Sequence, residues 1–242
     1  QCAATVKKVS MELGGHAPFI GFADVGVENL VGGALAAKFA TSGQDCLAAN
    51  RIYIQSEVYP EFLERFAAAV SNLKIGNGLE SDVQVGPLQN SKQLSKAEAH
   101  VEDALKKGAR LIMGGGRHER GGLFFEPTVL ADVTSDMLIY SEETFGPVAG
   151  IMAFDDEDSV LKAASDTEYG LAAYVFTRDI ERAWKFADTL EYGMVAVNSV
   201  KITGAPVPFG GIKQSGLGRE GAAQGMDAFT ETKYICMGTL AS

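Results

Sequence analysis

The sequence contains few cysteines and few histidines. Its 242 residues include three of each, and the cysteines Cys2, Cys46 and Cys236 lie far apart. An odd and widely spaced set of cysteines argues against a disulfide framework and favours a reducing compartment, so a cytoplasmic protein is expected. The histidines are isolated, and no cysteine pair or Cys/His cluster has the spacing of a zinc site. No metal is therefore expected.

Basic residues and long apolar runs are also scarce. The chain has 21 Lys and Arg against 31 Asp and Glu, a formal net charge of −10, and no basic cluster. Nucleic acid and anionic membranes are therefore not expected as partners. No apolar run approaches the roughly 18 residues that a membrane-spanning helix needs. The first residues, "QCAATVKKVS", lack an initiator Met and do not form a signal peptide, so we expect a chain cut from a longer one.

Hydrophobic residues make up 46% of the chain, enough for the core of one large domain. Short apolar segments alternate with longer amphipathic ones. Strands are predicted at 17–22, 51–55, 110–115, 124–130, 147–154, 172–177 and 193–198, and helices at 27–40, 59–73, 90–109, 156–166 and 179–190. This alternation predicts an α/β fold with a mostly parallel, twisted sheet flanked by helices. A late apolar segment, 229–238, is predicted to be a strand suited to pairing with the edge of another sheet.

Two residues near the start of the chain are candidates for chemistry. Glu12 precedes a Gly-Gly pair, and glycines permit backbone conformations and close approaches that other residues do not. Cys46 follows Gly43 and Gln44, where the backbone could approach a ligand and an N–H could stabilise an oxyanion. A nucleophilic thiol needs access and a base. Taken singly, Glu12 also fits a surface turn, and Cys46 also fits a buried structural thiol.

Two later segments are further candidates. In "EETFGP", residues 142–147, a carboxylate could accept hydrogen bonds from ribose hydroxyls and Phe145 could pack on a flat ring. A solvated acidic turn with a core Phe is the alternative. The glycine-rich segment 207–220 lacks the ending of a P-loop, and no GxGxxG motif follows a strand. Its charges, Lys213 and Arg219, are interpreted as residues that fix the loop.

The order of these segments is more informative than any one of them. "MELGG", then "GQDC" with Cys46 placed 34 residues after Glu12, then "EETFGPV" and "PFGGIKQSGLGRE" together resemble the aldehyde dehydrogenase superfamily, and most of all its succinate-semialdehyde dehydrogenases. The resemblance implies that Cys46 attacks an aldehyde to give a thiohemiacetal and that hydride passes to NAD or NADP. Glu12 then activates the water that hydrolyses the resulting thioester.

The resemblance also assigns binding residues. Glu143 matches the carboxylate that holds the nicotinamide ribose, and Phe145 the aromatic beside the nicotinamide; the implied cofactor set is Leu13, Gly14, Glu143 and Phe145. The implied substrate set is Gln44, Asp45, Asn198, Lys201 and Phe209. Family membership implies a homodimer or homotetramer that acts on a small-molecule aldehyde.

The same resemblance implies how the chain is divided. Residues 1–13 are expected to be a remnant of the cofactor-binding domain and residues 14–214 the catalytic domain. Residues 215–229 form a loop and helix that pack back toward the cofactor domain, and 230–242 an oligomerisation strand and tail. Because family members place roughly another domain ahead of "MELGG", this chain is expected to bind NAD poorly and to oxidise aldehydes negligibly alone.

Two residues depart from the family pattern: Ala40, which concerns the substrate, and Asp45, which concerns the thiol. Ala40 stands where succinate-semialdehyde enzymes often carry an arginine that grips the distal carboxylate, and Lys201 offers a replacement charge. Asp45 is expected to raise the pKa of the adjacent thiol unless its side chain turns into a hydrogen-bonded site. Succinate semialdehyde is the expected substrate. The alternatives are another semialdehyde or an aliphatic aldehyde, cysteine-dependent esterase activity of the fragment, or a non-catalytic assembly module.

Overall fold

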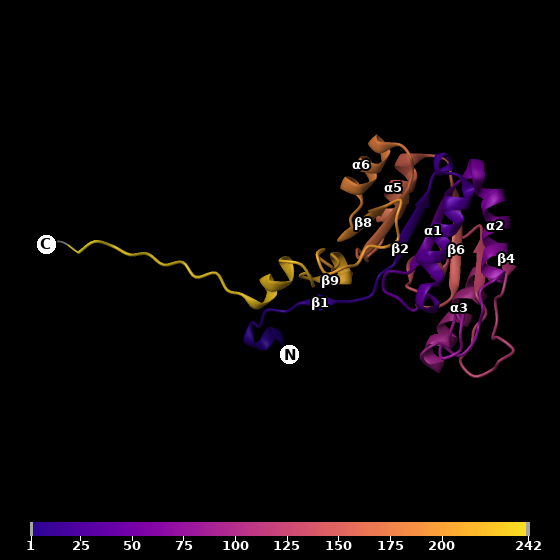
Figure 1. The fold of residues 1–242 in the computed structure, drawn as a ribbon, viewed down its shortest axis with the longest axis horizontal. Helices are drawn as coiled ribbons and strands as arrows, with labels where there is room; N and C mark the ends of the chain where they lie inside the picture. The colour runs from indigo at the N-terminus through magenta and orange to yellow at the C-terminus, as the bar shows by residue number, and fades with distance from the viewer. Residues whose placement is uncertain (1, 241–242) are drawn as a thin grey trace.

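A seven-stranded sheet forms the centre of the computed structural model, which describes residues 2–240 (Figure 1). Its order is β4-β5-β6-β3-β2-β7-β8, and every neighbouring pair is parallel except β4 with β5. The strands are β2 (Ala17–Gly21), β3 (Ala49–Gln55), β4 (Arg110–Met113), β5 (Thr128–Ala131), β6 (Val148–Phe154), β7 (Ala172–Phe176) and β8 (Met194–Val197). The predicted α/β class with a mostly parallel sheet is confirmed.

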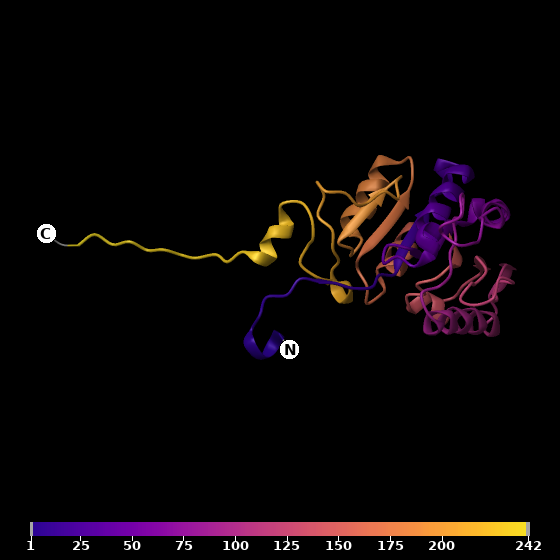
Figure 2. The same cartoon turned by 60° about the horizontal axis from the view of Figure 1, so that its bottom comes forward.

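Helices cover both faces of this sheet. They are α1 (Val27–Phe39), α2 (Tyr59–Ser71), α3 (Ser91–Lys106), α4 (Leu138–Ser141), α5 (Glu157–Ser165) and α6 (Ile180–Thr189). One core cluster joins α1 and α2 to strand residues on one face of the sheet, such as Phe19. The other joins α3, α5 and α6 to strand residues on the opposite face, such as Ile20. Figure 2 shows α1 and α3 well apart. Successive strand residues point to opposite faces, so a strand buried on both sides must be apolar throughout. None of the helices within residues 2–240 is long and apolar enough to cross a membrane.

The predicted elements differ from the observed ones mainly at their ends. The predicted strand 124–130 begins only at Thr128, because Pro127 has no N–H to donate to a ladder. The helix predicted at 90–109 begins after Asn90, whose side chain accepts a hydrogen bond from the Gln93 N–H, as helix-capping asparagines do. The single-turn helix α4 was not predicted, because four residues show no helical periodicity.

The strand order determines where the connections meet. Strands β6, β3 and β2 are neighbours and run in the same direction, so their amino ends lie at one edge of the sheet. Residues 12–16 lead into β2, residues 40–48 into β3, and residues 142–147 into β6. Three segments far apart in the sequence are therefore brought to one place. Each of them carries a motif singled out by the sequence.

A buried arginine fixes the first of these segments to the sheet. Arg51, on β3, is fully buried and donates hydrogen bonds to the carbonyl oxygens of His16, Ala163 and Ala164, at 2.8 to 3.4 Å. It also donates to the Tyr192 hydroxyl at 2.7 Å. The guanidinium thus satisfies carbonyls at the end of α5 and holds the chain just before β2 in place.

A second, two-stranded sheet lies outside the main one. Strand β1 (Met11–Glu12) pairs antiparallel with β9 (Gly216–Leu217), placing Glu12 opposite Gly216. A side chain at Gly216, where φ is +140°, would collide with the Met11 carbonyl. Lys8 also donates a hydrogen bond to the Thr230 carbonyl. The expected remnant 1–13 and the segment after residue 215 therefore contact each other, while the domain boundaries stay a prediction.

The strand predicted at 229–238 is not formed within the described chain. Phe229 ends a 3-10 turn (Gln224–Phe229), and residues 230–240 run away from the body of the molecule as an exposed segment (Figure 1). A strand needs a neighbour to pair with, and this chain offers none there. Residue 1 and residues 241–242, which belong to the predicted remnant and tail, lie outside the described residues.

Candidate active site

The three segments at the amino ends of β2, β3 and β6 surround one cavity of about 650 Å³. Its lining consists of Glu12, Leu13, Gly14, Gln44, Asp45, Cys46, Gln93, Lys96, Glu143 and Phe145. Both predicted catalytic residues and the whole predicted cofactor set are among them. Gln93 and Lys96 were missed. They lie three apart on α3 and so share a helix face, but no sequence pattern places α3 beside residues 142–147.

The segment that carries Cys46, residues 40–48, is called here the nucleophile loop. Thr41, Ser42 and Gly43 have φ of 51°, 61° and 68°, so the chain makes a left-handed turn directly after α1. Non-glycine residues in this region cost of order 1–3 kcal/mol each and persist only where the surroundings hold them. A side chain at Gly43 would collide with the Gly146 carbonyl, so this glycine permits a close approach to the segment before β6. The expected approach of its backbone to a ligand stays a prediction.

Side chains tie the tip of the nucleophile loop to residues 86–89. The Ser42 hydroxyl accepts a hydrogen bond from the Gly86 N–H at 2.8 Å. The Gln44 amide accepts from the Gln89 N–H at 2.8 Å and donates to the Pro87 carbonyl at 3.1 Å. Gln44, predicted to bind substrate, lines the cavity with its amide already paired. Its contacts therefore position the loop.

The Gly14-Gly15 pair permits close contact between the three segments. A Cβ on Gly15 would collide with the Cys46 carbonyl, and one on Gly14 would lie 2.7 Å from Glu143 Oε2. The Gly15 N–H donates to Glu143 Oε1 at 3.0 Å. The prediction that these glycines permit close approach is confirmed. They let the segment before β2 lie directly against the nucleophile loop and the Glu143 carboxylate.

The electrostatics of the cavity keep Cys46 protonated. Burial raises the pKa of the Cys46 thiol to about 12, and the negative charges of Glu12, Asp45 and Glu143 add to the effect. Burial also raises the pKa of Glu12, as do Glu220, Glu143 and Asp45, and Glu12 Oε1 is buried without a hydrogen-bond partner. The resting site therefore holds a neutral thiol, and a thiol in that state needs a base before it can attack.

The pKa of Glu143 is raised by one influence and lowered by others. Burial raises its pKa, whereas the Gly15 N–H, Lys96 and Lys38 lower it. Asp45 was expected to raise the pKa of Cys46 unless its side chain was hydrogen-bonded elsewhere. Its carboxylate does accept a hydrogen bond from the Leu47 N–H at 2.9 Å, but it still raises the pKa of Cys46. A paired carboxylate remains a negative charge beside the thiol.

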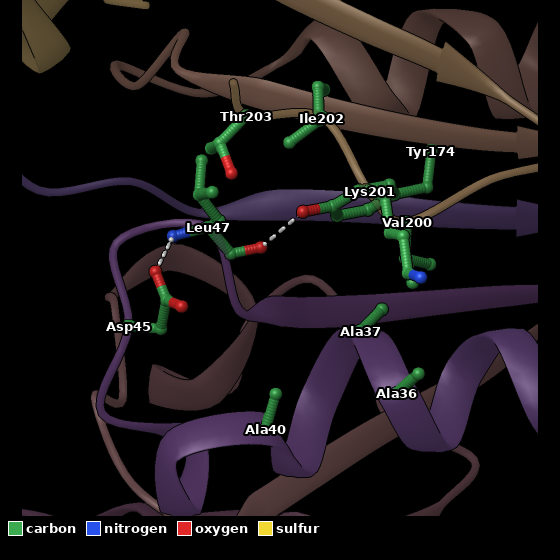
Figure 3. Close-up of a pocket in the computed structure, with 10 residues that line it drawn as sticks. All are labelled: Ala36, Ala37, Ala40, Asp45, Leu47, Tyr174, Val200, Lys201, Ile202 and Thr203. Carbon is green, nitrogen blue, oxygen red and sulfur yellow. Dashed lines mark hydrogen bonds between the residues drawn. The ribbon is translucent and has the colours of Figure 1, made fainter. Parts of the chain in front are cut away.

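Asp45 also lines a second cavity, of about 440 Å³ (Figure 3). Its lining consists of Ala36, Ala37, Ala40, Asp45, Leu47, Tyr174, Val200, Lys201, Ile202 and Thr203. The Tyr174 hydroxyl donates to the Leu47 carbonyl at 2.9 Å, so both backbone groups of Leu47 are held at this wall. Ala40 and Lys201, which the sequence singled out as a lost and a replacement charge, line the same space.

Two predicted substrate residues lie elsewhere. Asn198 follows the carboxyl end of β8, the opposite edge of the sheet from Cys46, and its side-chain amide bonds both the N–H and the carbonyl of Thr177, at 2.9 and 2.7 Å. Phe209 packs against the core, and its backbone pairs with Glu220. Neither lines the two cavities described above. In this chain the side chain of Asn198 holds the Thr177 backbone and that of Phe209 packs on the core, and their assignment to the substrate stays a prediction.

The charges of the glycine-rich segment act as predicted. Lys213 donates to the carbonyls of Ser165 and Thr167, at 3.0 and 3.3 Å, and forms an ion pair with Glu191. Arg219 donates to the Gly211 carbonyl at 2.9 Å. Both side chains fix the loop to its surroundings.

Fold and site together give an α/β protein in which a cysteine and three carboxylates, those of Glu12, Asp45 and Glu143, line one cavity. A sequence profile described as "Aldehyde dehydrogenase family" matches residues 1–235. The chain belongs to the aldehyde dehydrogenase family.

Its relatives act on several aldehydes by name. The chain is 55% identical over 242 residues to a non-phosphorylating aspartate-semialdehyde dehydrogenase of Halomonas elongata, covering 100% of this chain and 49% of that protein. It is 51% identical over 238 residues to the NADP(+) succinate-semialdehyde dehydrogenase GabD of Escherichia coli K12, covering 98% and 49%. A solved succinate-semialdehyde dehydrogenase of Burkholderia pseudomallei superposes with a TM-score of 0.95 at 50% identity, covering 98% and 49%. The chain spans about half the length of the curated relatives that it matches.

The Gly14-Gly15 pair generates a prediction about stability. Gly15→Ala places a methyl group against the Cys46 carbonyl, and we expect it to lower the free energy of unfolding by about 2 kcal/mol, a typical cost of forced overpacking. Gly32→Ala is the matched control, because that position on α1 has open space around it and a helical glycine is less favourable than alanine. Urea denaturation should show the control as stable as the parent chain or more so. Equal stability of the two variants would contradict the close contact.

Proposed function

We propose that this chain carries the cysteine and carboxylate machinery of an enzyme that oxidises an aldehyde to its carboxylic acid with NAD or NADP. The observation that supports this most is the convergence of Cys46, Glu12 and Glu143 on one cavity from three separate segments. Family membership supports the same reaction class.

The proposed chemistry starts at Cys46. Glu12, whose negative charge acts on the thiol, takes up the thiol proton as the sulfur bonds to the aldehyde carbon, giving a thiohemiacetal. When bound, NAD or NADP accepts the hydride that leaves this carbon. A thioester on Cys46 remains. Glu12 first releases the thiol proton to solvent and then removes a proton from the water that attacks the thioester. Cleavage of the carbon–sulfur bond releases the acid, and the proton held by Glu12 returns to the sulfur and restores the thiol. The raised pKa of Glu12 suits this role, because a base works best near the working pH.

The cavity fits the nicotinamide riboside half of the cofactor. The missing side chain of Gly14 leaves a space beside Glu143 that a Cβ would fill. The Glu143 carboxylate is placed to accept hydrogen bonds from ribose hydroxyls, with Leu13 and Phe145 on the same lining. Lys96 adds a positive charge on the α3 side. These residues are proposed to bind the ribose and to orient the nicotinamide toward Cys46.

The proposed substrate is an aldehyde with a negative charge at its far end, succinate semialdehyde first. The relatives are named for aspartate, succinate and glutarate semialdehydes, which each carry a distal carboxylate. In this chain Ala40 offers no charge, and the cation that lines the second cavity is Lys201. An ammonium there can pair with a carboxylate by charge-assisted hydrogen bonds. Another semialdehyde or an aliphatic aldehyde is the alternative.

The exposed C-terminal segment favours assembly as a homodimer or homotetramer. Tyr234, Ile235, Met237 and Leu240 have exposed fractions of 86%, 69%, 90% and 98%. Apolar residues this exposed on one segment are typical of a surface covered by another chain. Residues 230–240 are therefore proposed to add a strand to the sheet edge of a second copy.

The reaction can be tested by joining this chain to the N-terminal half of the Escherichia coli relative. Measured as NADH or NADPH production from succinate semialdehyde, the chain alone should show negligible turnover and the joined protein clear turnover. Cys46→Ala should abolish it. Glu12→Gln removes the base from both proposed steps, so it should suppress the burst of reduced cofactor and also lower turnover by about 100-fold or more, the range for a lost general base. Full turnover of the Cys46→Ala protein would refute the mechanism, whereas p-nitrophenyl ester hydrolysis by the chain alone, lost in Cys46→Ala, would reveal esterase activity.

Lys201→Met tests the substrate class in the same joined protein. Losing the ammonium should raise the KM for succinate semialdehyde by about tenfold or more, since a hydrogen bond to a charged group is worth about 1.5–3 kcal/mol. Butanal, which has the same chain length and no carboxylate, is the control and should keep its KM. Equal effects on the two aldehydes would show that Lys201 does not recognise the anion.

Deleting residues 230–242 tests assembly. Light scattering after gel filtration should give a multiple of the chain mass for the parent and the mass of one chain for the deletion. Trp184→Ala is the control, because this exposed aromatic on α6 lies outside the tail. It should leave the assembly intact. An assembly that survives the deletion would show that another surface holds the copies together.

A further inference from the structure

We propose that Lys38 is a positioning residue for the nucleophile loop, and that its hydrogen bond to Asn50 holds Cys46 in place by closing the base of that loop. The importance of this for catalysis rests on the proposed role of Cys46. The clamp itself is a property of this chain and can be measured without cofactor or substrate.

The two residues flank the nucleophile loop on either side. Lys38 lies in the last turn of α1, and Asn50 is the second residue of β3. Lys38 Nζ donates to Asn50 Oδ1 at 2.8 Å, and the two residues have exposed fractions of 0% and 1%. The contacts of Ser42 and Gln44 hold the tip of the loop to residues 86–89. The Lys38–Asn50 bond is therefore the side-chain tie at its base.

Burying the Lys38 amine at this position carries a desolvation cost. Burial lowers the pKa of Lys38 to about 7, and only the negative charge of Glu143 works against that. His16, before β2, and His100, on α3, also face this amine, and each has its own pKa lowered by it. A methionine would fill a similar volume without any desolvation cost, and replacing buried polar groups by apolar ones is often neutral or stabilising. The stability of the fold therefore does not account for a lysine here.

The strained turn explains what the amine does. Thr41 and Ser42 adopt left-handed conformations that survive only where the surroundings hold them. The turn folds back on its own start, because a Cβ on Gly43 would lie 3.2 Å from the Lys38 carbonyl oxygen. If the base opens, the turn can relax and carry Cys46 out of its half-buried position. Fixing residue 38 to residue 50 prevents this.

The proposal is tested with Lys38→Met, Asn50→Leu and the double variant. The measured quantity is the rate at which iodoacetamide alkylates Cys46 at mildly alkaline pH, followed by peptide mass spectrometry. The exposed Cys2 and Cys236 serve as references within the same chain. In the parent chain Cys46 should react slowly, because its pKa near 12 leaves little thiolate.

Each single variant should speed alkylation of Cys46 by about tenfold, because a loosened loop hydrates the thiol and one pKa unit changes the thiolate fraction tenfold. The double variant should be no faster than either single one, since all three lose the same bond. Cys2 and Cys236 should react as before in every variant.

Melting temperatures measured in parallel separate positioning from packing. The single variants leave one buried polar group unpaired and should melt earlier, whereas the double variant should recover the parent's stability and still react fast at Cys46. Parent-like slow alkylation in the double variant, or no change in any variant, would overturn the proposal. If Lys38→Met does not fold, the Asn50→Leu and double variants still decide it. A failure of aldehyde oxidation would leave this result unaffected.

Discussion

The parallel alignment of β6, β3 and β2 is the constraint on which the site depends. Adjacent parallel strands present their amino ends at the same edge, so the segments leading into them must meet. Glu12, Cys46 and Glu143 lie on three such segments and would be unrelated without this alignment. The Gly14-Gly15 pair and Gly43 then let the segments lie closer than residues with side chains would allow. The strand order determines where the three segments meet, and the glycines determine how closely they approach one another.

Negative charge where the three segments meet raises the pKa of the Cys46 thiol and also that of Glu12. Glu12, Asp45 and Glu143 all disfavour the thiolate, so the resting Cys46 is a neutral thiol in a half-buried position. The same crowding raises the pKa of Glu12 and makes it a better base. Lys96 and Lys38 lower the pKa of Glu143, which favours its ionised form. One cavity thus holds two carboxylates suited to different tasks, because their surroundings differ.

Sequence reasoning succeeded where a pattern is local or its order is distinctive. Period-two and helical patterns placed the strands and the long helices, and four ordered motifs identified Glu12, Cys46 and Glu143. It failed where the outcome depends on a partner in space. The two-residue strands β1 and β9 have no periodicity to detect, and no pattern indicates that the Asn198 side chain bonds the Thr177 backbone. The segment 229–238 has the composition of a strand but pairs with no strand within residues 2–240. Lys38 lies in the predicted helix 27–40, but no sequence pattern singled it out, and the fold buries it.

The departures from the succinate-semialdehyde pattern fall on one side of the nucleophile. Ala40 and Lys201 line the second cavity, whereas the residues assigned to the cofactor line the first and keep the family pattern. Asp45 borders both cavities, and its carboxylate is fixed to the Leu47 backbone at the boundary. The nucleophile loop lines both spaces, but the remaining lining residues of the two cavities come from different segments. We therefore expect substitutions at residues 200–203 to leave the first cavity undisturbed.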